Sequence, residues 1–184
     1  MALSQPETVI LAEDEASLYL QATTMAVWAP KGQTPVVKIH PGREKVNFYG
    51  TLNLKTGQEV VTRTTTMNSE SSAQHLQQVL DGYPDQQILL LWDRAKWHQG
   101  QAVKELLAAN PRLEVMFFPP ASPDLNPQEQ VWKKTRRAVS HNHSIRKLAH
   151  LADADDFELF LTSSSFPSSF LHLFALDHIS TGFT

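Results

Sequence analysis

The chain has 184 residues, which is enough for one domain with a full hydrophobic core. Apolar residues make up 41% of it and charged residues 19%, a balance typical of a soluble globular protein. It contains no cysteine, no apolar run long enough to span a bilayer, and no signal-peptide pattern at its start. These features exclude disulfides, thiolate chemistry and a membrane protein, and we expect a cytoplasmic location.

The net charge of −3 argues mildly against a nucleic-acid-binding protein, but the basic residues are unevenly distributed. A group of them follows residue 132 within a short stretch. Such a run is as consistent with a solvated helix face as with contacts to DNA phosphates. The run comprises Lys133, Lys134, Arg136 and Arg137, with Arg146 and Lys147 further along.

The first half of the chain is rich in β-forming residues. Residues 8–12 lead into three consecutive acids, Glu13, Asp14 and Glu15, and predict a buried strand that ends in them. Residues 46–54 and 59–66 predict a hairpin, and Gly50 inside the first run indicates a bend or close packing. Prolines and a glycine predict a loop over 30–35, followed by a short strand over 36–40.

The second half alternates between strands and helices. The continuous apolar run 88–92 ends at Asp93 and is typical of a strand buried on both faces of a parallel sheet. This alternation predicts a layered α/β domain with right-handed crossovers. The predicted elements are a helix over 70–80, strands over 88–92 and 115–118, helices over 101–109, 127–139, 145–152 and 155–161, and an apolar tail, 170–179, docked on the body.

The stretch 119–132 contains the most informative turn in the chain. Two prolines end the preceding strand, Asn126 suits a helix N-cap, and Pro127 suits the first helical position. Glu129 lies three residues after Asn126, which is the spacing of a capping box. The alternative is that the turn delivers Glu129 to a fixed place beside two aspartates.

Three acids stand at predicted strand ends or at a helix start: Asp14, Asp93 and Glu129. Ligands of open α/β sheets gather at such ends. Magnesium prefers oxygen ligands, and two such ions about 3.5–4 Å apart activate water and stabilise the leaving oxygen in phosphoryl transfer. Each acid also has a plainer explanation, because Asp93 can cap the next helix and Asp14 can be a solvated strand end. His98 can orient a phosphate or water, or serve only in capping and packing.

Three segments together resemble the catalytic domain of DDE transposases of the mariner-like superfamily, especially the bacterial insertion-sequence branch. The resemblance covers roughly residues 8–150. It rests on LAEDE (11–15), LLWDRAKWH (90–98) and PPASPDLNPQEQVW (119–132). The third segment is the most specific, since it is similar to the family's proline–serine–proline–acid–leucine–asparagine–proline signature with a glutamate two residues after the last proline.

The resemblance implies an RNase H-like α/β fold: a five-stranded mixed sheet, three antiparallel strands then two parallel, with helices on both faces. It implies that Asp14, Asp93 and Glu129 hold two Mg²⁺ ions, which Mn²⁺ replaces. Water then cleaves a DNA strand, and the freed 3′-hydroxyl attacks target DNA. The implied partners are transposon ends and target DNA, with a homodimer as the active form. His98 and Asn126 would support the site, and Lys133, Lys134, Arg136 and Arg137 would bind DNA.

Two departures from the family pattern matter. Arg94 stands where relatives often carry asparagine, which affects the local geometry after Asp93. Relatives also carry a helix-turn-helix region ahead of the catalytic domain, and the first acid here is already residue 14. We therefore expect one domain over 1–184 without an N-terminal helix-turn-helix, as in half of a split element, a truncated remnant or an excised domain. Sequence-specific DNA recognition would be weak or absent.

Three other functions stay open at this point. The same acids serve an RNase H-like nuclease that hydrolyses DNA without strand transfer. An inactive transposase remnant would act only as a binding module. A carboxylate-pair hydrolase such as a glycosidase needs no metal, so its activity would be insensitive to chelators.

Overall fold

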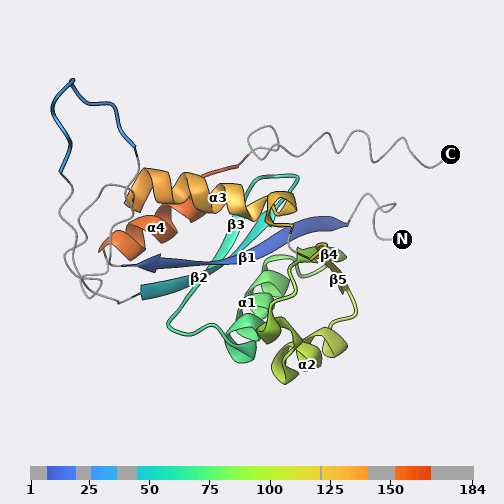
Figure 1. Ribbon diagram of the computed structural model, residues 1–184. Helices are drawn as coiled ribbons and strands as arrows, with labels where there is room; N and C mark the ends of the chain where they lie inside the picture. The colour runs from blue at the N-terminus through green and yellow to red at the C-terminus, as the bar shows by residue number, and fades with distance from the viewer. Residues whose placement is uncertain (1–7, 20–25, 37–44, 121, 141–151, 167–184) are drawn as a thin grey trace.

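The structure is a computed structural model that describes residues 8–19, 26–36, 45–120, 122–140 and 152–166 (Figure 1). The strands are β1 (Val9–Tyr19), β2 (Lys45–Asn53), β3 (Glu59–Thr64), β4 (Ile88–Trp92) and β5 (Leu113–Phe117). The helices are α1 (Ser69–Gly82), α2 (Gln101–Ala109), α3 (Gln128–Thr135) and α4 (Ala152–Ser163). Short 3₁₀ helices span Lys96–Gln99 (η2) and Pro123–Leu125 (η3), and a π-helical turn spans Arg136–Ser140.

Among the described helices, none has both the length and the apolar character that a membrane span requires.

The five strands form one mixed sheet in the order β3-β2-β1-β4-β5. β1 pairs antiparallel with β2, and β2 with β3, whereas β4 and β5 run parallel to β1. The predicted arrangement of three antiparallel strands followed by two parallel ones is therefore confirmed. β1 lies at the centre, where the two kinds of pairing meet.

β1 is longer than predicted, because it continues through its three acids to Tyr19. The expectation that the strand ends at these acids is wrong. β2 supplies hydrogen-bonding partners along the added length, with Asp14 opposite Gly50 and Tyr19 opposite Lys45. On the other side, β4 pairs only as far as Ala12 and ends at Trp92. Asp14 is thus in the middle of its own strand, yet it lies beside the carboxyl end of β4.

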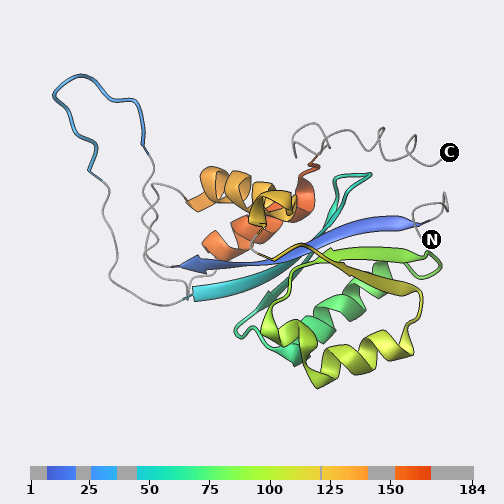
Figure 2. The same ribbon diagram turned by 45° about the vertical axis from the view of Figure 1, so that its right-hand side comes forward.

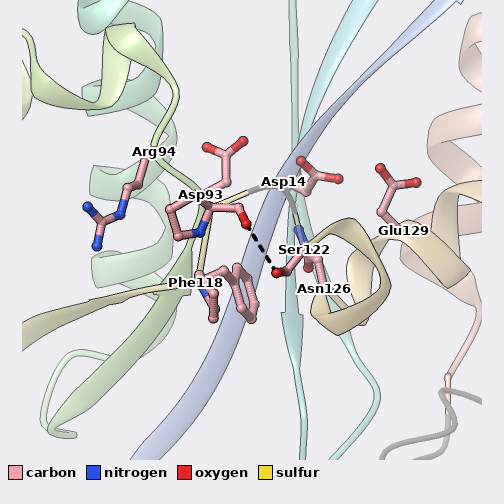
Figure 3. Close-up of a pocket in the computed structure, with 9 residues that line it drawn as sticks. Asp14, Asp93, Arg94, Phe118, Ser122, Asn126 and Glu129 are labelled. Atoms are coloured by element: carbon pink, nitrogen blue, oxygen red, sulfur yellow. Dashed lines mark hydrogen bonds between the residues drawn. The ribbon is translucent and has the colours of Figure 1, made fainter.

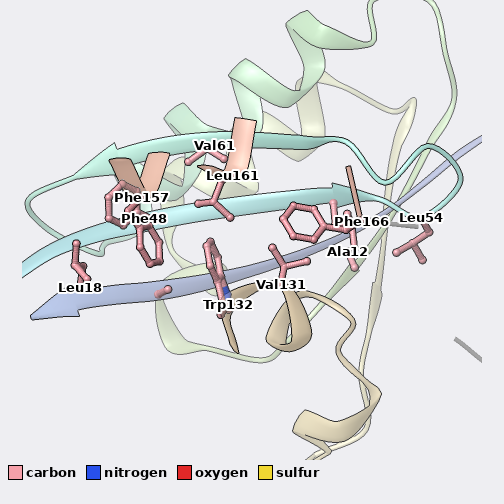
Figure 4. Packing of buried hydrophobic residues seen from close by; sticks show 12 residues of the cluster. Ala12, Leu18, Phe48, Leu54, Val61, Val131, Trp132, Phe157, Leu161 and Phe166 are labelled. Atoms are coloured by element: carbon pink, nitrogen blue, oxygen red, sulfur yellow. The ribbon is translucent and has the colours of Figure 1, made fainter. Parts of the chain in front are cut away.

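One face of the sheet packs against α3 and α4 (Figures 1 and 2). Figure 4 shows the apolar layer between them, in which side chains from β1 and β2 meet those of both helices. Burial of such apolar side chains away from water is the main favourable term in folding. The layer includes Ala12, Ala16, Phe48, Leu52, Val131, Trp132, Phe157 and Leu161. An ion pair of 2.9 Å between Arg63 and Asp155 joins α4 to β3 at the surface.

The opposite face packs against α1 and α2, so the prediction of helices on both faces is confirmed (Figure 2). Its apolar layer includes Leu11, Leu76, Leu80, Leu90, Trp92 and Val103. A polar group interrupts this layer, because the His75 ring is buried between the hydroxyls of Thr51 and Thr62, each 2.7 Å from a ring nitrogen. Burial lowers the pKa of His75 to about 3.

Most other predicted elements agree with the structure. The hairpin β2–β3, the helices α1 and α2 and the helix α4 lie where the residue pattern placed them. The helix predicted to reach residue 139 divides into α3 and the π-helical turn. The strand predicted over 36–40 (apart from Val36, which is not in a strand), most of the helix over 145–152, and the tail 170–179 lie outside the described residues.

Candidate active site

Asp14, Asp93 and Glu129 line one pocket of about 330 Å³ (Figure 3). They come from three elements: the middle of β1, the residue after β4, and the first turn of α3. Figure 3 shows all three carboxylates directed to the same side of the pocket. The remaining described lining residues are Arg94, Phe118, Pro119, Pro120, Ser122 and Asn126.

The start of α3 is fixed to β1 through Asn126. Its side-chain oxygen accepts a hydrogen bond of 3.1 Å from the Gln128 amide, and its side-chain nitrogen lies 3.5 Å from the Glu13 carbonyl oxygen. The helix starts one position later than predicted, with Pro127 as the cap residue. Within the described residues, the Glu129 carboxylate makes no hydrogen bond, so the reciprocal bond of a capping box is absent. Glu129 is instead presented to the pocket.

Asp14 is held from the helix side of the pocket. The indole nitrogen of Trp132 donates a hydrogen bond of 3.2 Å to its Oδ2. Burial and the neighbouring carboxylates of Glu15 and Glu129 raise the pKa of Asp14 to about 7. The pocket therefore concentrates negative charge, and an added cation would relieve it.

Asp93 is held by its own loop and by His98. Its Oδ1 accepts a hydrogen bond of 2.8 Å from the Ala95 amide and lies 3.0 Å from His98 Nδ1. The hydrogen bond from His98 lowers the pKa of Asp93 below its ordinary value. The plainer prediction that Asp93 caps the next helix is wrong, because η2 follows Ala95 without a side-chain cap bond and the Asp93 carboxylate lines the pocket.

His98 is buried and does not line the pocket, so it cannot orient a phosphate there in this structure. Its Nε2 lies 2.8 Å from Glu15 Oε1, and its ring stacks on Trp92 with centroids 3.8 Å apart. Burial alone would lower the pKa of His98, but hydrogen bonds to Asp93 and Glu15 outweigh it and raise that pKa to about 9. His98 supports the site from behind, through Asp93.

The predicted DNA-binding residues divide into two pairs. Lys133 and Arg137 are exposed and lie four residues apart, on α3 and on the π-helical turn that follows it. Lys134 is half-buried, and its amine lies 5.1 Å from the centre of the Phe166 ring. Arg136 is also half-buried. The exposed pair is therefore the better candidate for contact with a ligand.

Sequence reasoning missed two residues that hold the pocket aspartates. Trp132 donates to Asp14 from 118 positions away, and no local pattern indicates that contact. Glu15 accepts hydrogen bonds from both His98 and Trp97. Its role follows from alternation along a strand: once β1 is known to continue past Asp14, Glu15 must face the side opposite to Asp14.

The residues of the pocket fit a hard divalent cation. All three acids offer carboxylate oxygens, which Mg²⁺ and Mn²⁺ prefer. Of the described lining residues, Arg94 carries the positive charge, and Figure 3 shows its guanidinium directed away from Asp14 and Glu129. The guanidinium lies over the Phe117 ring instead, 5.7 Å from its centre. The mutual repulsion of the pocket carboxylates is therefore left for a bound ion to offset.

A central mixed sheet of this order, covered by helices on both faces and carrying acids at the meeting point of β1 and β4, defines an RNase H-like fold. The chain belongs to the DDE superfamily endonuclease family, whose model matches residues 9–152.

Known proteins agree with this assignment. The chain is 26% identical over 147 residues to the insertion element IS630 uncharacterized 39 kDa protein of Shigella sonnei, covering 79% of this chain and 43% of that protein. Its fold is similar to the Mos1 strand transfer complex, with a TM-score of 0.65, 17% identity and coverage of 89% of this chain and 50% of that one.

The Mos1 transposase catalytic domain with raltegravir and Mg gives a TM-score of 0.60 at 15% identity, covering 89% of this chain and 76% of that one. Likeness at such low identity establishes the fold alone. The chain spans half or less of the length of the IS630 protein and of the Mos1 chain in the strand transfer complex.

Proposed function

We propose that this chain is the catalytic domain of a transposase that cleaves DNA and transfers the cut strand with the help of divalent metal ions. The observation that carries the proposal is the meeting of Asp14, Asp93 and Glu129 in one pocket, in a chain of the DDE superfamily endonuclease family. Sequence position alone left each of these acids with a plainer explanation.

The three carboxylates would hold two Mg²⁺ ions, with Mn²⁺ as a substitute. Ligand oxygens around one Mg²⁺ lie at most about 4.2 Å apart, twice its bond length of about 2.1 Å. In the described part of the chain, one group of three acids or histidines has ligand atoms within 4.8 Å of one another, and it does not consist of the pocket acids. The carboxylates of Asp14, Asp93 and Glu129 are therefore spaced more widely than 4.8 Å. That spacing favours acids shared between two ions over three acids on one.

The residues in and around the pocket would then have separate roles. Bound divalent ions supply water activation and stabilisation of the leaving oxygen. Trp132 orients Asp14, His98 orients Asp93, and Asn126 fixes the first turn of α3 so that Glu129 faces them. Catalysis by such a site consists mostly of positioning and charge stabilisation.

The chemistry proposed is two displacements at phosphorus. In the first, the oxygen of a water molecule bonds to phosphorus, the bond to the 3′ oxygen breaks, and that oxygen leaves as a 3′-hydroxyl. In the second, this hydroxyl attacks a phosphodiester of target DNA and displaces another 3′ oxygen. Joining transposon ends to a target favours two copies of the chain acting together, and a homodimer is part of the proposal.

The exposed pair Lys133 and Arg137 would bind the phosphates of DNA next to the pocket. Both follow Glu129 at four-residue intervals, on α3 and the π-helical turn after it, so they extend one line of side chains away from the acids. Lys134 and Arg136 are half-buried and would contribute less to binding.

The test is metal-dependent nicking of supercoiled DNA by the Asp93→Ala variant. Loss of one of three metal ligands should reduce the nicking rate by at least about 100-fold. Asp124→Ala is the matched control, because Asp124 is an exposed acid close by in η3 that does not line the pocket. Full nicking by Asp93→Ala would remove Asp93 from the mechanism.

The products separate the remaining alternatives. Joined strands support strand transfer, while nicks without joined strands would reduce the activity to that of an RNase H-like nuclease. Cleavage that persists in a chelator would contradict the metal-dependent mechanism altogether.

A further inference from the structure

The face of β1 opposite to the pocket carries a second cluster of ligand-type side chains. Side chains alternate along a strand, so Glu13 and Glu15 point away from Asp14, to the side of α1 and η2. His98 reaches the same place from η2. One ligand atom from each of these three residues lies within 4.8 Å of the others.

Glu13 is the unusual member of this cluster. It is fully buried at 0% exposure, and both of its carboxylate oxygens lack a hydrogen-bond partner among the described residues. Burial, together with the nearby carboxylate of Glu15, raises the pKa of Glu13 well above its ordinary value. A buried carboxylate without partners is costly, and proteins normally pair such a group or use it to bind a metal.

The surroundings match those of a metal-bound histidine. A ligating imidazole commonly uses one ring nitrogen for the metal and donates the other N–H to a carboxylate. Here His98 Nε2 faces Glu15, while Nδ1 lies 3.0 Å from Asp93 Oδ1. Trp97 donates a hydrogen bond of 2.6 Å to Glu15 Oε1, so a second ligand is oriented as well.

We propose that Glu13, Glu15 and His98 form a second metal site, behind the pocket, that takes a divalent transition-metal ion such as Zn²⁺. Two carboxylates and one imidazole suit Zn²⁺ or Co²⁺, whereas Mg²⁺ prefers oxygen ligands alone. The site is closed, since the side chains of His98 and Glu15 are 0% and 7% exposed. Its ion would tie β1 to η2 and set the orientation of Asp93 through His98.

The ion would lie between His98 Nε2 and Glu15 Oε1, which are 2.8 Å apart in the structure. Glu13, which forms no hydrogen bond to His98 in the structure, would become a ligand only when the ion is present.

Co²⁺ titration of the full chain in excess Mg²⁺ tests the proposal, because visible Co²⁺ absorption reports imidazole coordination and Mg²⁺ saturates an all-oxygen site. We expect one Co²⁺ to bind per chain and to raise the Tm by roughly 5–10 °C at a hundredfold excess over Kd. His98→Gln and Glu13→Gln should each lose both effects. Glu13→Gln should still fold without metal, because it removes a buried carboxylate that has no partner.

Two further variants make the outcome specific. Glu59→Gln changes a half-buried glutamate that bonds Gln128 on the opposite face, and should keep the Co²⁺ signal. The double variant Asp14→Asn, Glu129→Gln removes pocket carboxylates and should keep it too. Absence of Co²⁺ binding to the wild type, or binding that survives His98→Gln, would overturn the second site. Neither result depends on whether the chain cleaves DNA.

Discussion

Asp14 and Asp93 line the same pocket but stand in different electrostatic surroundings. Asp14 is affected most by burial and by the neighbouring carboxylates, although Trp132 donates a hydrogen bond to it, whereas Asp93 receives hydrogen bonds from Ala95 and His98. Their pKa values move in opposite directions for that reason. Asp14 therefore depends more than Asp93 on a bound cation to remain ionised at neutral pH.

The indole of Trp132 is expected to tune the metal affinity of Asp14. Trp132→Phe keeps an aromatic ring in the core but removes the donor 3.2 Å from Asp14 Oδ2. We expect the Mn²⁺ concentration for half-maximal nicking to rise about tenfold, the lower end of what loss of such a partner costs. Trp28→Phe is the control, since Trp28 is fully exposed. An unchanged Mn²⁺ titration in Trp132→Phe would contradict the assignment.

The residues of the pocket could be predicted from sequence because each sits in a short motif. Asp93 follows a continuous apolar run, and Glu129 follows a proline turn with a good cap residue. Residues that hold them could not be found in this way. The partner of Asp14 is an indole 118 positions away, and His98 has the same spacing from Asp93 whether it packs or binds a phosphate. Only the folded contacts distinguish such roles.

Among the elements, β2 and α3 approach each other closely at Gly50. A Cβ at Gly50 would lie 2.5 Å from the Gln128 side-chain nitrogen and 2.5 Å from Trp132 Cη2. Gly50 is also the cross-strand partner of Asp14. The absence of a side chain at Gly50 therefore allows α3, and with it Glu129, to lie close against the sheet.

Gly50→Ala should force α3 away from β2. Overpacking of this kind costs about 1–3 kcal/mol in the free energy of unfolding, and nicking should fall because Glu129 moves with the helix. Gly82→Ala is the matched control, since a Cβ there meets nothing within 4 Å. Urea unfolding of both variants measures the difference. Equal stabilities would show that α3 has room to yield.

The same close packing was expected from a glycine inside a strand, and it is what the structure contains. Strand and helix positions were likewise predictable where apolar residues follow a clear period, as in β4 and α2. The end of β1 was not, because three consecutive acids look like the end of a buried strand. Pairing between strands determines where β1 ends, because β2 continues beside β1 after β4 has ended.

On the scale of the whole molecule, buried ionisable groups couple stability to pH. His75 stays neutral in the folded protein down to about pH 3, whereas an unfolded histidine takes up a proton near pH 6.5. The unfolded state therefore binds more protons between these values. The contribution of His75 to stability is intact above pH 6.5 and is lost as the pH falls below it.

We expect this single group to remove about 2 kcal/mol of unfolding free energy between pH 7 and pH 5. His75→Gln should be less stable at pH 7, because the Thr51 and Thr62 hydroxyls lose a matched partner, but its stability should fall less steeply with acid. Urea unfolding at both pH values gives the comparison. Parallel curves for the two proteins would mean that His75 titrates normally in the fold.

The distribution of exposed charge leads to a prediction about DNA binding. Replacing Lys133 and Arg137 with glutamine should lower the slope of log affinity against log salt by about 1.8 for duplex DNA, because each phosphate that a side chain neutralises contributes about 0.9 to that slope. Lys55 and Lys104 are exposed lysines elsewhere on the chain, and replacing them is the control. If both double variants keep the wild-type slope, Lys133 and Arg137 belong to an ordinary solvated surface.

The run of three acids in β1 makes the strand intolerant of slippage. A shift by one residue would still bring a carboxylate, from Glu13 or Glu15, to the place of Asp14. It would also move the other of these two glutamates into the place of Ala12 or Ala16, inside the apolar layer beneath α3 and α4. A carboxylate in the apolar layer would be buried without a partner, so the shifted register is destabilised. The alanines at positions 12 and 16 therefore ensure that Asp14, and not Glu13 or Glu15, faces the pocket.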